Sequence, residues 1–180
     1  MVSLLVVFYI FIGLFAIIGA MRGWVKELLV IFSVILALAF ITILENLIPF
    51  TKDMIVEGST GQFWLRAAIV ASLAFFGYQS PKITRLSEAV GRRDKIQDFI
   101  LGLLFGVVSG YMIVGTLWSY MNAAGYPFKP YMTAPANDPT LGKAAEALLG
   151  WLPPAIVLGQ QPWIYIVVVF SFIFVIVVFI

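Results

Sequence analysis

A long uncharged segment constrains this chain more than any other feature. No Asp, Glu, Lys or Arg occurs between Asp98 and Lys129, and the segment opens with Gly102, Gly106 and Gly110 at four-residue spacing. An apolar segment of this length can cross a bilayer as a helix. Four residues advance a helix by about 400°, so the glycines form one bare stripe along it. In lipid, such a stripe lets a second helix approach closely. The pattern therefore predicts helix packing at these three glycines.

Composition places the chain among membrane proteins. Of its 180 residues, 62% are hydrophobic and 11% are charged, whereas a soluble domain has about 25% charged residues. There is no cysteine, which excludes disulfides and thiolate metal sites, and no histidine, which excludes a Ser-His-Asp triad and imidazole ligands. The net charge of +2 is too small to suggest nucleic acid binding. We expect no cofactor, and we expect the lipid bilayer as the main partner.

Five apolar runs predict membrane spans. They are residues 2–20, 28–44, 63–80, 99–121 and 163–180, and each is close to the roughly 20 residues that a spanning helix needs. We expect the first run to be a retained span rather than a signal peptide, because no basic residue precedes it. The turn after it is very short, so the first two helices should be antiparallel neighbours. The predicted fold is all-α, a multi-pass bundle of about five spans.

The third run is the weakest predicted span, because Arg66 lies near its start. An arginine within a turn of a helix end can still extend its charged group to the membrane surface. Three small residues share one face of this run and could meet the glycine stripe of the fourth helix. They are Ala67, Ala71 and Ala74.

Two segments outside the runs are expected to be short amphipathic helices on the membrane surface. Residues 82–98 hold five of the eleven basic residues together with apolar residues at helical spacing. The other begins at Asp138-Pro139, which favours a helix start, and ends near Gly150 and Pro153. Its apolar face comprises Leu141, Ala145, Leu148 and Leu152. The chain thus divides into a four-helix membrane domain over 1–121, a Pro-rich loop over 122–161 and a C-terminal helix over 162–180.

The basic residues also predict an orientation. The first and third connections carry seven Lys and Arg residues, and the second and fourth carry four. Because basic loops stay in the cytoplasm, we expect the N-terminus outside and residues 82–98 in the cytoplasm.

The polar motif Arg22, Gly23, Lys26 and Glu27 lies beside the first span and has two interpretations. In one, the two basic residues anchor helix ends among headgroups, Gly23 permits a tight reversal, and Glu27 is favoured by the dipole of the second helix. In the other, Arg22 and Glu27 form an ion pair at membrane depth in a conduction or coupling path. Asp98 is expected to be the N-cap of the fourth helix. No arrangement of residues suggests catalysis, so we expect a protein that is not an enzyme.

Taken together, these motifs resemble the colicin V production protein (CvpA) family of bacteria. The family is a set of inner-membrane proteins, usually with four spans, associated with colicin V production or export and with envelope homeostasis. The resemblance therefore implies a non-enzymatic supporting role in the bacterial inner membrane. Two features differ from the family. Ser109 stands where many members have an arginine, and the apolar tail after Pro162 is additional to the usual four spans. The resemblance rests on Gly19-x-x-Arg22-Gly23-x-x-Lys26-Glu27, the basic amphipathic stretch, and Asp98-x3-Gly102-x3-Gly106-x3-Gly110.

Two other functions remain open. The extra C-terminal helix and the lack of a reactive group of residues would suit a structural accessory subunit of a larger membrane complex. Arg22 and Glu27 would suit a small channel or transporter component. Other membrane proteins, or a second copy of the chain, are the expected protein partners.

Overall fold

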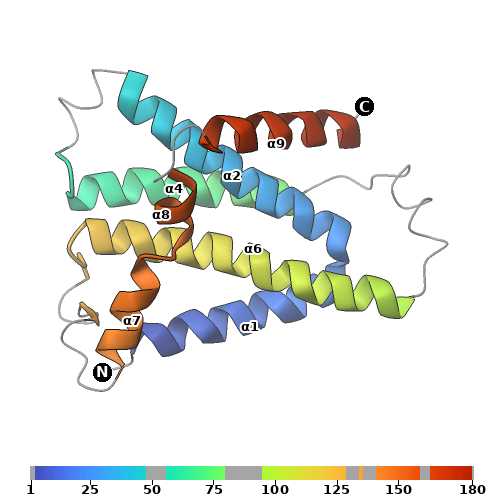
Figure 1. The fold of residues 1–180 in the computed structure, drawn as a ribbon, viewed down its shortest axis with the longest axis horizontal. Coiled ribbons are helices and arrows are strands. Elements are labelled where there is room, and N and C mark those ends of the chain that lie inside the picture. Colours follow the sequence, from blue (N-terminus) through green and yellow to red (C-terminus); the bar gives the residue numbers. More distant parts are fainter. Residues whose placement is uncertain are drawn as a thin grey trace.

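Figure 1 shows the computed structural model of the chain, which describes residues 3–47, 56–79, 95–128, 134–135, 141–158 and 163–179. In these residues the regular elements are helices and no strand occurs, as the composition predicts. The elements are α1 (Leu4–Arg22), α2 (Trp24–Leu47), α4 (Thr60–Tyr78), α6 (Lys95–Ala123), α7 (Gly142–Leu149), α8 (Pro153–Leu158) and α9 (Trp163–Phe179).

The long helix α6 is the centre of the bundle. It packs most extensively against α1, and it also contacts α2 and α4. In Figure 1, α6 lies between α1 on one side and α2 with α4 on the other. The helices α1 and α2 run in opposite directions, as their short connection predicts, but α6 separates them over most of their length. The main partner of α1 is therefore α6, whereas α2 packs mainly on α4, the next described helix, and then on α6.

The second helix supplies much of the core. Val30, Val34, Ala37 and Leu38 of α2 are fully buried, and they recur at the spacing of one helix face. The α4 helix packs closely against this part of α2, because a Cβ at Gly77 would lie 2.5 Å from Ser33 Oγ. Many large side chains of α1 and α9 instead remain exposed on the outside of the bundle. This distribution suits a protein whose surroundings are apolar.

Among the described helices, three are long and apolar enough to cross a membrane: α1, the Trp24–Glu45 part of α2, and α6. The remaining two predicted spans correspond to α4 and α9. Helix bounds extend beyond several of the apolar runs. The α4 helix begins at Thr60, before the apolar run, because Ser59 caps it by accepting a hydrogen bond of 3.2 Å from the Gln62 N–H.

The C-terminal part differs from the single surface helix that the sequence predicts. It forms α7 and then α8, and Pro153 begins the second helix rather than only ending the first. The predicted start at Asp138-Pro139 lies outside the described residues. The segment packs against the bundle, since a Cβ at Gly115 of α6 would lie 2.8 Å from Pro153 Cδ. The Tyr111 hydroxyl also donates a hydrogen bond to the Trp151 carbonyl. The absence of a side chain at Gly115 therefore lets Pro153, at the start of α8, pack directly against α6.

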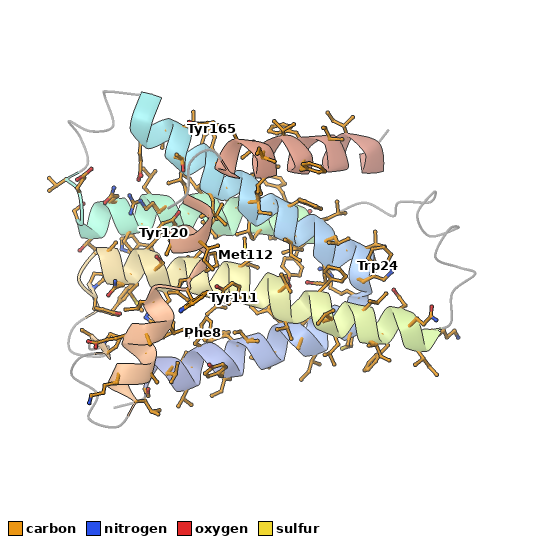
Figure 2. All side chains as sticks on the ribbon, in the orientation of Figure 1. Phe8, Trp24, Tyr111, Met112, Tyr120 and Tyr165 are labelled. Carbon is orange, nitrogen blue, oxygen red and sulfur yellow. The ribbon has the colours of Figure 1, made fainter. Side chains whose placement is uncertain are left out.

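The ends of the bundle carry different connections. The turn from α1 to α2 lies at the same end as the start of α6, and the ends of α2 and α6 lie at the other (Figure 1). Figure 2 labels Trp24 at the first end and Tyr120 near the second. The first and third connections thus share one end, as the predicted orientation requires. Most of the predicted surface helix over 82–98 falls outside the described residues, and its last four residues form the start of α6.

Candidate functional site

A buried ion pair lies where α1 turns into α2. Arg22, the last residue of α1, donates a hydrogen bond of 2.9 Å from Nη1 to Glu27 Oε1. Glu27 lies in the first turn of α2, and its side chain is fully buried, whereas the Arg22 side chain is 21% exposed. Ionisable groups at membrane depth are costly unless they are paired. The geometry agrees with the interpretation of Arg22 and Glu27 as an ion pair.

This ion pair connects four helices. Ser109 of α6 donates a hydrogen bond of 2.6 Å from Oγ to the second carboxylate oxygen of Glu27. Arg22 Nη2 donates one of 2.8 Å to the carbonyl of Tyr78, the last residue of α4. The guanidinium carbon also lies 4.3 Å from the centre of the Tyr78 ring, which adds a cation–π contact. We call Arg22, Glu27, Tyr78 and Ser109 the polar clamp.

The glycine stripe packs α6 against α1 next to the polar clamp. A Cβ at Gly106 would lie 2.5 Å from the Phe15 carbonyl oxygen and 3.0 Å from Gly19 Cα. Gly102 likewise contacts the backbone of Gly19, and Gly110 faces the Phe15 side chain. The partner of the stripe is therefore α1, and the prediction that Ala67, Ala71 and Ala74 of the third span meet it is wrong.

Gly23 and Asp98 meet at the turn between α1 and α2. Gly23 has φ +88°, a conformation that favours glycine, and its N–H donates a hydrogen bond of 2.9 Å to the Gly19 carbonyl. A Cβ at Gly23 would lie 2.9 Å from Asp98 Oδ2. The predicted N-cap role of Asp98 is wrong, because α6 begins at Lys95 and Asp98 lies in its first turn. Its carboxylate instead lies beside the start of α2, where the helix dipole favours an anion.

Lys26 lies outside the polar clamp. Its side chain is exposed on α2, which agrees with a role as an anchor among headgroups. The structure thus brings Arg22 together with Glu27, and Gly23 together with Asp98, whereas the exposed Lys26 belongs to neither pair.

A second ion pair at the opposite end of α2 was not predicted. Arg66 of α4 donates two hydrogen bonds to Glu45, from Nε to Oε1 at 2.6 Å and from Nη2 to Oε2 at 2.9 Å. Gln62 Nε2 donates a third, of 3.2 Å, to Oε1. The guanidinium lies 5.0 Å from the centre of the Tyr120 ring. Gln62 and Arg66 are one helix turn apart and therefore share a face of α4. This spacing is the feature of the sequence that indicates that the two side chains can bind the same acceptor.

The polar clamp can fix helix ends, and its charges are already engaged. One oxygen of Glu27 accepts from Arg22 and the other from Ser109. Over the described residues, no group of three or more His, Cys, Asp or Glu side chains could hold a metal ion. The chemical contribution of the clamp is therefore to tie the adjoining ends of α1, α2 and α4 to the middle of α6.

Comparison with protein-family models, with curated proteins and with solved structures finds no match to this chain. The resemblance to the colicin V production protein family therefore rests on the sequence motifs alone.

Proposed function

We propose that this chain is a non-enzymatic integral membrane protein, similar to the colicin V production proteins, that supports toxin production or export and envelope maintenance in the bacterial inner membrane. One observation carries the proposal: the two motifs on which the resemblance rests meet in one site. Gly23 of the first motif lies beside Asp98 of the second, since a Cβ at Gly23 would lie 2.9 Å from Asp98 Oδ2. Gly19 of the first packs on Gly102 and Gly106 of the second. Their contact supports a single shared role.

The geometry of the clamp supports a structural role better than a catalytic one. A general base needs a carboxylate that can reach a substrate proton, and both oxygens of Glu27 are already hydrogen bonded within the bundle. The clamp joins the end of α1, the start of α2 and the end of α4 to the middle of α6. A partner that docks on these helices would depend on the arrangement that the clamp maintains.

Complementation of a deletion strain tests this function. We expect the wild-type chain and Lys143→Gln to restore toxin secretion and resistance to membrane stress, because Lys143 is exposed and lies outside both motifs and the clamp. Glu27→Gln removes the charge that pairs with Arg22, so we expect it to reach the membrane but restore little of either phenotype. Unchanged secretion, stress resistance and biofilm formation in the deletion strain would rule out the proposed function.

The proposed topology has five spans, with the N-terminus outside and residues 82–98 in the cytoplasm. Its support is that the first and third connections share one end of the bundle (Figure 1) and carry the larger number of basic residues. The chain has no cysteine, so single cysteines can be placed at exposed sites. An impermeant thiol reagent should label Glu57→Cys in intact cells, whereas Lys26→Cys should require permeabilised cells. The reverse pattern would show that the orientation is inverted.

A structural accessory subunit is the second candidate, and α9 favours it. This uncharged helix contacts α2 and α8, yet large side chains such as Tyr165, Phe170 and Phe172 remain more than half exposed. In the membrane, either lipid or the helices of a larger complex would cover them. Purification in a mild detergent separates the candidates, because a subunit should co-purify with defined partner proteins. A chain that runs alone or as a simple homo-oligomer would exclude the subunit role.

A further inference from the structure

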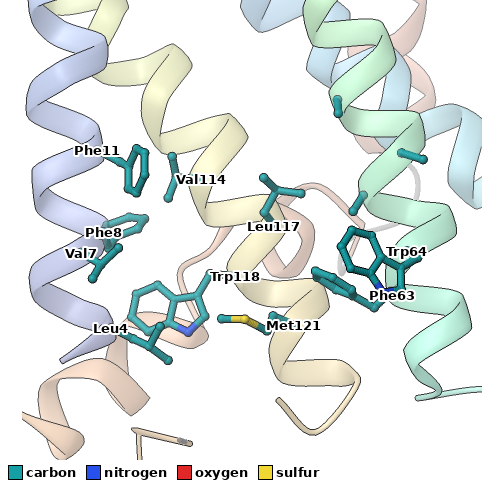
Figure 3. Close-up of a pocket in the computed structure, with 13 residues that line it drawn as sticks. Leu4, Val7, Phe8, Phe11, Phe63, Trp64, Val114, Leu117, Trp118 and Met121 are labelled. Carbon is teal, nitrogen blue, oxygen red and sulfur yellow. The ribbon is translucent and has the colours of Figure 1, made fainter. Parts of the chain in front are cut away.

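An apolar groove opens between α1 and α4, with α6 as its floor (Figure 3). Its volume is about 450 Å³, which is within the range of about 300–1,000 Å³ typical of ligand sites. All thirteen lining residues are Leu, Val, Phe, Trp, Ala or Met. In Figure 3, Phe8 and Phe11 extend from α1 and Phe63 and Trp64 from α4, with Trp118 of α6 between the two sides.

The groove follows the long direction of the bundle from one end. It starts at Leu4, the first residue of α1, and at Met121, in the last turn of α6. It reaches inward to Phe11 on α1 and Val114 on α6. Seven residues of helix correspond to roughly 10 Å, and half of the hydrocarbon core is about 15 Å thick. The groove therefore extends over most of the depth of one leaflet and stays within it.

We propose that this groove binds one acyl chain of a membrane phospholipid from the leaflet at that end. Because α1 and α6 are long and apolar enough to span the membrane, the open side of the groove faces hydrocarbon. An acyl chain that enters from the headgroup region would lie along the groove. The inference is independent of the proposed role in export or envelope maintenance.

The lining favours an acyl chain over a helix from another protein. Helices in membranes associate through small residues that let their backbones approach, as the glycine stripe does between α1 and α6. Three small residues of α4 line the groove, Ala67, Ala68 and Ala71. The groove also presents five aromatic side chains, which hold a helix backbone away from these alanines but leave room for a thin chain. They are Phe8, Phe11, Phe63, Trp64 and Trp118.

The floor of the groove also suits a ligand without polar groups. Trp118 is only 4% exposed, and its single polar atom, Nε1, donates a hydrogen bond of 3.3 Å to the Tyr126 hydroxyl. The ring therefore offers apolar surface to the groove. Trp64, at 56% exposed, lies at the rim on the α4 side.

Quenching of Trp118 fluorescence by brominated lipid tests the proposal. In the full chain, the other four tryptophans are changed to phenylalanine, so that Trp118 is the only one left. This variant is placed in vesicles of phosphatidylcholine whose acyl chains carry bromine in mid-chain. We expect strong quenching, although this ring is almost fully buried. Ala67→Leu with Ala71→Leu fills the groove from α4, so most of the quenching should be lost. Gly13→Leu is the control, because nothing lies within 4 Å of its Cβ position, and quenching should be unchanged.

Native mass spectrometry of the chain with all its tryptophans gives a second measurement. One phospholipid should stay bound to the wild-type chain and to Gly13→Leu, and it should be lost from the Ala67→Leu, Ala71→Leu double variant. Three results would overturn the proposal: equal lipid retention by the groove-filled variant, retention of a free fatty acid instead, or a dimer that the filling substitutions abolish. The last result would assign the groove to a helix of a second copy.

Discussion

Glu27→Ala should destabilise the bundle by about 3 kcal/mol, the lower end of the cost of removing one partner from a buried ion pair. The substitution leaves Arg22 without its carboxylate and Ser109 without its charged acceptor. The cost should stay at the lower end because the Arg22 side chain is 21% exposed and can turn toward headgroups. Thermal unfolding in detergent, followed by tryptophan fluorescence, should show a midpoint lower by roughly 6–12 °C.

Two controls separate loss of the ion pair from a general effect of mutation. Lys26→Ala removes an exposed charge one position away and should leave the midpoint almost unchanged. Arg22→Ala combined with Glu27→Ala should cost less than the sum of the single changes, because neither charge is then left alone. If Glu27→Ala and Lys26→Ala unfold at the same temperature, the polar clamp does not hold the bundle together.

Gly106→Leu should separate α6 from α1. A Cβ at this position would lie 2.5 Å from the Phe15 carbonyl oxygen and 3.0 Å from Ala16 Cα. Backbone atoms cannot rotate aside as a side chain can, so the two helices must move apart. We expect a loss at or above the upper end of the about 1–3 kcal/mol that overpacking costs, seen as a lower unfolding midpoint in detergent. Insertion into the membrane should survive, because the span becomes more hydrophobic.

The matched control is Gly13→Leu, which makes the same change on the partner helix where no atom lies within 4 Å of the new Cβ. Its unfolding midpoint should be close to that of the wild-type chain. Equal midpoints for Gly106→Leu and Gly13→Leu would show that the glycine stripe does not face α1.

The helical architecture could be predicted from the apolar runs, but the helix bounds could not. Hydrophobicity marks the part of a helix that lies in the membrane, whereas a helix continues wherever its backbone can remain hydrogen bonded. The α6 helix therefore starts at Lys95, four residues before its apolar run, and α2 starts at Trp24. The same limit explains why the apolar run predicts Asp98 as a helix cap, although it lies in the first turn of α6.

The candidate site could be predicted only where its contacts are local. Arg22 and Glu27 are five residues apart, so their pairing follows from the turn between two helices. Ser109 and the Tyr78 carbonyl come from distant segments, and a single sequence contains no signal for those contacts. The glycine stripe indicates that another helix packs closely on α6, but it does not indicate which helix. Gly19 and Ala16 form a matching face on α1, but small residues on the third span offered an equally good match.

The position of α6 between α1 and α2 has a consequence for how the protein is made. The ribosome completes α1 and α2 well before α6, and the partner of Glu27 at Ser109 follows 82 residues later. At a synthesis rate of about 5–20 residues per second, this interval lasts roughly 4–16 s. During that time the glycine-packing face of α1 has no α6 to pack against, and Arg22 is the one clamp residue already available to neutralise Glu27. The local ion pair therefore lets an acidic residue enter the membrane before the helix that encloses it exists.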